Sequence, residues 1–322
     1  MMTSKSRSHH DYKVGWICAL SKEQTAAMAM LDEEHDLLPK PPSDSNVYTL
    51  GSISGHNIVI ACLPEGQIGT NSAATVATQM VNTFPSVRFG LLVGIGSGIP
   101  PRVRLGDVVV SQPSGGHPGV VQWDFGKAEQ EGQIVQTGSL NQPPGALLAA
   151  LTKLKSRHEM KGHNIHKLLD QMTAKWPRLA PNYTCSARLK DPLYSSPRAT
   201  SDFSAVKESR KPGEISIHYG LIASGNQVIK DSATRDRINK SLAGQVLCFD
   251  MEAAGLMKSF PCTVIRGICD YADSLKKKDW QDYAAAIAAA FAKELLESVQ
   301  PTDIEGDKRA SEVLKQSQYP FV

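Results

Sequence analysis

Residues 248–274, CFDMEAAGLMKSFPCTVIRGICDYADS, decide the fold class of this chain. The pattern predicts an apolar strand that ends at residue 249, a helix of small residues over 251–260, and a second apolar strand over 262–268. A strand, a helix and a second strand in this order are typical of α/β proteins. Both strands run directly into acidic residues, and a buried charge is costly unless it has a partner or a function. These acids are therefore the first candidates for chemistry.

The same alternation of strands and helices continues on either side of this segment. The predicted fold class is therefore α/β: a single domain with a mixed, largely parallel central sheet and helices on both faces. No internal repeat is visible in the sequence. The further predicted strands are 14–20, 47–50, 58–63, 89–100, 104–112 and 215–224, and the further helices are 21–31, 71–84, 145–154, 233–242 and 280–299.

The domain boundaries follow from where this pattern starts and stops. Residues 1–12 are predicted to be a disordered N-terminus, and residues 13–299 to form the domain. Prolines, serines and charges without a sustained period predict an irregular insertion over 155–211. Residues 300–322 are polar and are predicted to be a tail or linker.

The composition argues against several classes of protein. The net charge is only +3 and the basic clusters are short, so we expect no nucleic-acid partner, although a partner with phosphate groups stays open. The six cysteines form no CxxC pair, as is typical of free thiols in a reducing compartment. The nine histidines show no HExxH spacing, and we expect neither a metal nor a cofactor. The longest apolar run, 283–292, is too short to span a bilayer, so we expect a cytoplasmic protein with no membrane partner.

The glycine-rich end of the strand over 89–100 is a second candidate for a ligand site. Glycines in the segment GIGSG, 94–98, let the backbone approach an anion or a sugar, and Ser97 adds a hydroxyl group. Pro100 and Pro101 follow where a helix should begin, which excludes the dinucleotide-binding motif. Taken alone, the segment is explained equally well as a tight turn.

Several charged residues have both a structural and a functional interpretation. Asp250 is predicted to cap the following helix. The small residues after Glu252 suggest tight packing that would leave its carboxylate facing a crevice, and a functional and a structural role are equally well supported for it. Asp270 follows the last strand at the edge where α/β sheets bind their ligands. Arg266 is predicted to form a buried ion pair with one of the acids. Glu23 follows the first strand at a spacing from Ser21 that does not suit a capping box, which favours a functional role.

Taken in this order, a Glu after the first strand, GIGSG, ASGNQVI, DMEAAG and CDYADS resemble the purine nucleoside phosphorylase and nucleosidase superfamily. The resemblance covers residues 14–299 and is closest to the nucleosidase branch, especially to the domain at the N-terminus of fungal receptor-like multidomain proteins. It implies a nucleoside phosphorylase-like fold, a homodimer, and fusion to or action with an NTPase or repeat region.

The resemblance implies a role for each acid. Cleavage of a purine N-glycosidic bond passes through a cationic sugar, which needs a proton for the departing base and negative charge near the ribose. Asp270 matches the residue that protonates or hydrogen-bonds the purine N7, Glu252 the ligand of the ribose hydroxyls, and Glu23 the residue that activates the attacking water. The substrate-binding residues implied are Gly96, Ser97, Val228, Ile229, Met251 and Cys269. Cys269 stands where many members have Ser, and Asn226 where Asp is common.

The resemblance also favours water over phosphate as the nucleophile. Phosphorylases that resemble this chain carry an Arg at the position of Gly94, and an Arg-containing loop where this chain has ALSKEQ. The predicted function is a purine N-ribosyl hydrolase that releases adenine from adenine nucleosides or nucleotides, ATP included. Two alternatives stay open: a phosphate-dependent phosphorylase, and a non-catalytic nucleoside-sensing module. The basic residues that could receive substrate phosphates are Arg102, Arg104, Lys127 and Lys230.

Overall fold

A sheet of ten strands forms the centre of the structure, counted over the residues that the computed structural model describes: 7–128, 134–195, 213–275, 278–303, 306 and 308–318. Its strands are β1 (Val14–Cys18), β2 (Glu33–His35), β3 (Tyr48–Ile53), β4 (His56–Cys62), β5 (Phe89–Gly98), β6 (Val108–Ser111), β7 (Val120–Gln122), β10 (Ile217–Ser224), β11 (Val246–Asp250) and β12 (Cys262–Asp270). A separate hairpin consists of β8 (Lys127–Ala128) and β9 (Ile134–Val135).

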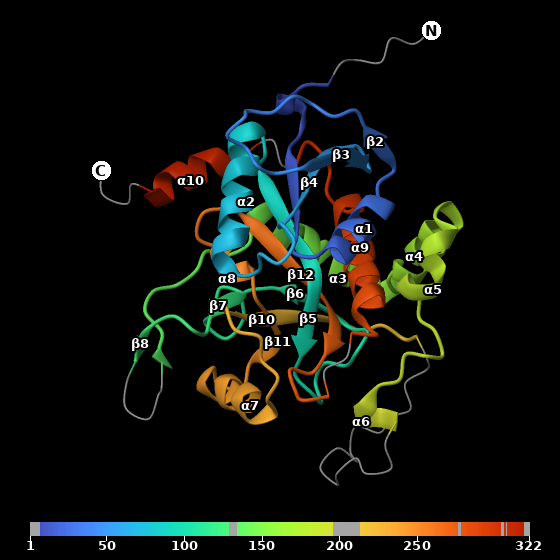
Figure 1. Ribbon diagram of the computed structural model, residues 1–322, viewed down its shortest axis with the longest axis vertical. Helices are drawn as coiled ribbons and strands as arrows, with labels where there is room; N and C mark the ends of the chain where they lie inside the picture. The colour runs from blue at the N-terminus through green and yellow to red at the C-terminus, as the bar shows by residue number, and fades with distance from the viewer. Residues whose placement is uncertain are drawn as a thin grey trace.

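The sheet closes on itself at one end. Its order is β11-β10-β6-β12-β5-β1-β4-β3-β2, with β7 beside β10, and β11 also pairs with β5. Strands β5, β12, β6, β10 and β11 therefore form a closed ring, while β1 to β4 extend from it as an open sheet (Figure 1). The pairing of β12 is parallel to β5 and antiparallel to β6. The predicted α/β class and mixed sheet are confirmed, whereas the ring closure was not predicted.

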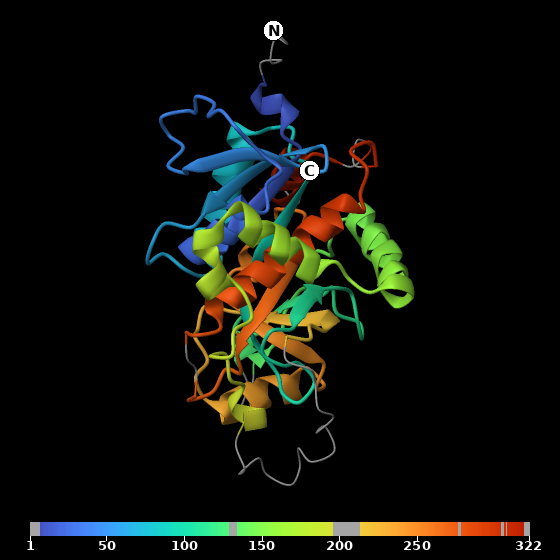
Figure 2. The ribbon, with the colours of Figure 1, turned by 90° about the vertical axis from the view of Figure 1, so that its right-hand side faces the viewer.

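Helices cover both faces of this sheet, as predicted. One face carries α1 (Ser21–Ala29), α3 (Gly145–Lys161), α4 (Ile165–Lys175) and α9 (Gln281–Glu297), of which α9 crosses the strands in Figure 2. The other carries α2 (Thr70–Thr83), α8 (Ala253–Leu256) and α10 (Ala310–Gln318). The remaining helices are α5 (Ala180–Tyr183), α6 (Pro192–Ser195), α7 (Ser232–Ser241), and the short 3-10 helices η1 (His9–Asp11) and η3 (Pro177–Leu179).

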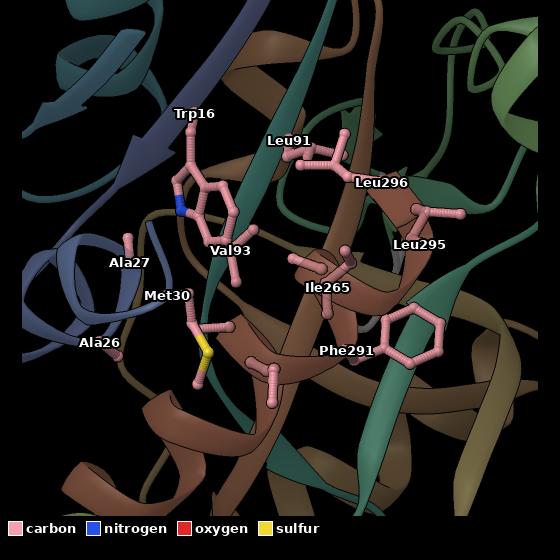
Figure 3. Packing of buried hydrophobic residues seen from close by; sticks show 14 of the residues in the cluster. Trp16, Ala26, Ala27, Met30, Leu91, Val93, Ile265, Phe291, Leu295 and Leu296 are labelled. Atoms are coloured by element: carbon pink, nitrogen blue, oxygen red, sulfur yellow. The ribbon is translucent and has the colours of Figure 1, made fainter. Parts of the chain in front are cut away.

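The central strands are buried on both faces, which explains their continuous apolar sequences. Trp16, Val93 and Ile265 belong to the same buried apolar cluster as Phe291 of α9 (Figure 3). Ile17, Leu92 and Val264, each one residue away along its strand, lie in the core on the opposite side of the sheet, because successive side chains point to opposite faces. All nine residues of β12 are buried.

The predicted irregular insertion over 155–211 is wrong for most of its described part. Helix α3 continues to Lys161, and α4, η3, α5 and α6 follow. Four apolar residues of α4 recur at helical spacing and are buried, and this stripe should have predicted the helix: Ile165, Leu168, Leu169 and Met172. Residues 196–212 lie outside the described part of the chain.

The described parts of both predicted termini contain helices. Residues His9–Asp11 form η1, and Tyr12 is fully buried, so the predicted disorder does not hold for this part of 1–12. Helix α10 lies in the predicted polar tail and contacts α2. Its first residue, Ala310, is fully buried and donates its N–H to the carbonyl of Val87 at 2.8 Å. Residues 1–6 and 319–322 lie outside the described residues.

None of the described helices combines the length and the apolar character that a bilayer crossing requires.

Candidate active site

The centre of the candidate site is Arg266, which lies fully buried within β12. Its Nη2 donates to a carboxylate oxygen of Asp250 and lies 3.6 Å from Oε2 of Glu252. Burial alone would lower the pKa of Arg266, but the negative charges of Asp250, Glu252 and Glu23 raise it above the ordinary value. The predicted buried ion pair of Arg266 is therefore confirmed, and several acids share it.

Glu23 connects the first turn of α1 to the glycine-rich end of β5. Its Oε1 accepts the N–H of Ile95 at 2.8 Å. Its Oε2 accepts the N–H groups of Ala19 at 2.7 Å and Leu20 at 3.0 Å. Burial raises the pKa of Glu23, and the charge of Arg266 and these backbone donors partly offset the rise. The sequence interpretation set a capping role aside, yet the carboxylate does reach back to Leu20, which precedes the helix.

Gly94 lies against the side chains of both Glu23 and Arg266. A Cβ atom at Gly94 would lie 2.3 Å from Oε1 of Glu23 and 2.6 Å from Nη1 of Arg266. Both distances are far below van der Waals contact, so only glycine fits here without moving the acid or its counter-ion. The glycine-rich strand end therefore makes room for the charged cluster.

Glu252 approaches Arg266 from the start of α8. Its Oε1 accepts the N–H of Gly69 at 3.2 Å. Burial raises the pKa of Glu252 to about 7, and Arg266 limits the rise. Asp250 accepts the N–H of Ala253 at 3.0 Å, so its predicted capping role is confirmed, and it also holds Arg266.

Asp270 lies at the end of β12 beside a cavity of about 260 Å³. Its Oδ1 accepts the N–H of Ala272 at 3.0 Å, and its Oδ2 accepts the thiol of Cys269 at 3.2 Å. Cys269, Tyr271 and Trp280 line the same cavity, whereas Glu23 and Glu252 do not. The three predicted acids thus form two neighbouring groups: the two glutamates around Arg266, and Asp270 farther along the strand.

The pairing of β5 with β12 fixes the distance between these two groups. Gly94 lies opposite Arg266, and Ser97 lies opposite Asp270. Three residues along a strand correspond to about 10 Å. Ser97 is buried and also pairs with Phe249 of β11, so the ring closure brings β11 against the same strand end. Gly96 keeps this contact close, because a Cβ there would lie 3.1 Å from the carbonyl of Phe249.

The predicted purine-holding segment lies next to both groups. Ile229 is buried in one apolar cluster with Ala272, which follows Asp270 by two residues. Val228 is 46% exposed, so its side chain is at the surface. Oδ1 of Asn226 accepts the N–H of Thr70 at 3.0 Å, next to the Gly69 that donates to Glu252.

Met251 lies between two of the acids along the chain and is half-buried, while its carbonyl faces Gly69. Gly69 and Trp280 were not predicted as members of the site. The signal for Gly69 was available, because it lies in the segment PEGQIG, and its φ of 96° is one that favours glycine.

Comparison with known proteins agrees with this architecture. Residues 13–300 match the family model described as Phosphorylase superfamily. Over 306 residues the chain is 45% identical to a nucleotide-binding leucine-rich repeat (NLR)-like protein of Hyaloscypha variabilis, and the match covers 92% of this chain but only 30% of that protein.

Two further relatives carry enzyme names. A 5′-methylthioadenosine/S-adenosylhomocysteine nucleosidase of Mycobacterium tuberculosis is 26% identical over 301 residues, which cover 88% of this chain and 95% of that protein. The ATP nucleosidase Cap17 of Escherichia coli is 22% identical over 238 residues, which cover 71% of this chain and 39% of that protein.

Among solved structures, the futalosine hydrolase of Helicobacter pylori has the same fold, with a TM-score of 0.61 at 17% identity over 91% of this chain and 100% of that one. Because the family model matches nearly the whole chain and the fold agrees with it, the chain belongs to the phosphorylase superfamily.

Proposed function

We propose that this chain is a purine N-ribosyl hydrolase that releases adenine from adenine nucleosides or nucleotides, ATP included. The observation that carries the proposal is the placement of Glu23 and Glu252 around the buried Arg266, about 10 Å along the sheet from Asp270. The nucleosidase names of two relatives support the same reaction class.

Glu23 is the proposed general base for water. Its pKa is raised by burial, so its ionised form takes a proton more readily than an ordinary carboxylate does. As the water oxygen bonds to C1′ of the ribose, the C1′–N9 bond breaks and its electron pair leaves with the purine. Asp270 gives or shares a proton with N7, and exchange with solvent returns the proton that Glu23 took. The products are free adenine and a ribose that keeps its 5′ substituent.

Glu252 is the proposed partner of the ribose hydroxyls. Its ionised form places negative charge beside the cationic sugar of the transition state. With a pKa of about 7, this form is the major one only above about pH 7. Ser97, Gly96 and Met251 complete the sugar side, and Cys269, Val228 and Ile229 complete the base side.

The crowding at Gly94 supports water as the nucleophile. An arginine that could hold inorganic phosphate does not fit at this position while Glu23 occupies its present place. The proposal extends to a homodimer in the cytoplasm. It also extends to action within a longer receptor-like protein with an NTPase or repeat region, since the NLR-like relative is much longer than this chain.

A chromatographic assay tests the function. The protein is incubated with ATP, adenosine and guanosine in phosphate-free buffer, and free base is measured. We expect adenine to appear without phosphate. The Asp270→Asn and Glu252→Ala variants should each abolish this release. Release that requires phosphate would identify a phosphorylase. Tight binding of unchanged nucleoside would identify a sensing module instead.

A further inference from the structure

The cavity beside Asp270 has a mixed lining of acidic and basic residues. Besides Asp270, it is lined by Asp273 and Asp279, and by two cations, Arg188 and Lys190. The cations come from the segment predicted as an insertion, which the structure brings to the end of β12. None of the basic residues that the sequence suggested for phosphate binding lines this cavity: Arg102, Arg104, Lys127 and Lys230. Arg102 donates instead to the carbonyl of Val246.

Hydrogen bonds hold the backbone of this segment against the strand end. Tyr271, directly after Asp270, donates its hydroxyl to Oδ2 of Asp191 at 2.6 Å. The N–H of Leu193 donates to Oδ1 of Asp191 at 3.0 Å. Trp280 donates its ring N–H to the carbonyl of Lys190 at 3.4 Å. The position of Lys190 beside the cavity is therefore fixed by its neighbours.

The side chains of Arg188 and Lys190 remain available for a ligand. Both residues are exposed, and neither forms an ion pair with any residue in the described part of the chain. Of the acids in the lining, Asp273 already accepts the N–H of Leu275 at 3.0 Å. Two cations that border a concave surface and have no ion-pair partner among the described residues are suited to a phosphate chain.

The geometry of a nucleoside directs its phosphates to this cavity. In the anti conformation, the C8–N7 edge of the purine lies on the same side as C5′ of the ribose. If Asp270 contacts N7, as the proposed function requires, a substituent on C5′ extends to the side that Asp270 shares with Arg188 and Lys190. We propose that Arg188 and Lys190 bind the 5′-phosphates of the substrate and so select nucleotides over nucleosides. This inference rests on the proposed function.

The test compares adenine release from ATP and from adenosine. The double variant Arg188→Ala, Lys190→Ala is measured beside wild type and a control, Lys153→Ala, Arg157→Ala, which removes the same charges from exposed positions of α3. We expect the ratio of kcat/KM for ATP to that for adenosine to fall by about tenfold or more in the first variant only. Inorganic tripolyphosphate should inhibit wild type but not this variant.

Two outcomes overturn the inference. In the first, the double variant keeps full activity on ATP and an unchanged ratio of kcat/KM for ATP to that for adenosine, which means that the phosphates bind elsewhere. The other is an equal loss on ATP and adenosine, which means that the segment only shapes the cavity. If wild type releases no adenine from any substrate, the proposed function fails. Calorimetry then still decides the phosphate site, because ATP should bind wild type more tightly than adenosine does, and the double variant should lose that preference.

Discussion

Arg266 Nη2 lies 3.6 Å from Glu252 Oε2 inside the protein, where both side chains are nearly inaccessible to solvent. The same nitrogen is hydrogen-bonded to Asp250, and Glu23, which lies against Gly94 as Arg266 does, adds its charge. One cation thus gathers three acids from two separate parts of the sequence. Because Glu23 and Glu252 are the proposed ligands of water and ribose, the guanidinium would, under the proposed function, set the geometry of the reaction as well as stabilise the sheet.

Arg266→Met should destabilise the protein strongly. Removing one partner of a buried ion pair leaves the other charges desolvated and uncompensated, which costs about 3–5 kcal/mol. Urea unfolding at neutral pH measures the loss. The matched control is Arg7→Met, because Arg7 pairs with Glu33 at 3.2 Å at the exposed surface, where an ion pair contributes about 0–1 kcal/mol. Similar losses in both variants would contradict the central role of Arg266.

Glu252 should make stability depend on pH. Its pKa is raised in the folded state to about 7, above the ordinary value near 4.5, so the folded protein binds more protons than the unfolded chain between these values. The contribution of this carboxyl group to the free energy of unfolding is therefore fully present below about pH 4.5 and is lost as the pH rises through 7. Glu252→Gln cannot ionise, so the variant should gain stability relative to wild type between pH 5 and pH 8. Unfolding curves of both proteins at pH 5 and pH 8 measure this gain. If the difference in stability between Glu252→Gln and wild type is the same at the two pH values, the pKa of Glu252 is not raised in the folded protein.

Glu23→Gln should lower turnover more than binding. Under the proposed function, the amide cannot take a proton from water, and loss of a general base costs about 10²–10⁴-fold in rate. The glutamine oxygen can still accept the N–H of Ile95, but its amide nitrogen cannot accept those of Ala19 and Leu20, so unfolding curves are measured beside the kinetics to confirm that the variant is folded. Saturation kinetics on adenosine should give a reduced kcat with KM within about threefold of wild type. Glu33→Gln, at an exposed position, serves as the control, and equal rates in all three proteins would remove Glu23 from the mechanism.

Much of the fold could be predicted because it depends on local sequence patterns. The continuous apolar runs of β5 and β12 predicted central strands, and the alternation with helices predicted an α/β sheet. The closure of β11 onto β5 could not be predicted this way, because a pairing between distant strands leaves no local period. Helix α10 was missed for a similar reason, since its contact with α2 depends on a surface formed elsewhere in the chain.

The candidate site was predicted only in part. The order of the motifs indicated Glu23, Glu252 and Asp270, and the structure places the two glutamates together and Asp270 in the adjoining cavity. The roles of Gly69 and Trp280 depend on loops whose positions no spacing rule gives. Arg266 was assigned one partner, whereas the fold gives it several, because strand, helix and loop ends converge on it.

Gly94→Ala tests whether the glycine of β5 is needed for space between charged groups. The added Cβ would lie 2.3 Å from Oε1 of Glu23, so either this carboxylate or the strand must move. Overpacking of this kind costs about 1–3 kcal/mol, and the displaced carboxylate should also lose its hydrogen bond with Ile95. Thermal unfolding and adenine release should therefore both decline. In the control Gly145→Ala, at the start of α3, the new Cβ meets no atom within 4 Å, and stability should hold or rise by about 0.4–1 kcal/mol. If Gly94→Ala instead keeps the stability and adenine release of wild type, Glu23 has room to move. The crowding of Glu23 and Arg266 at Gly94 then does not hold the proposed general base in position.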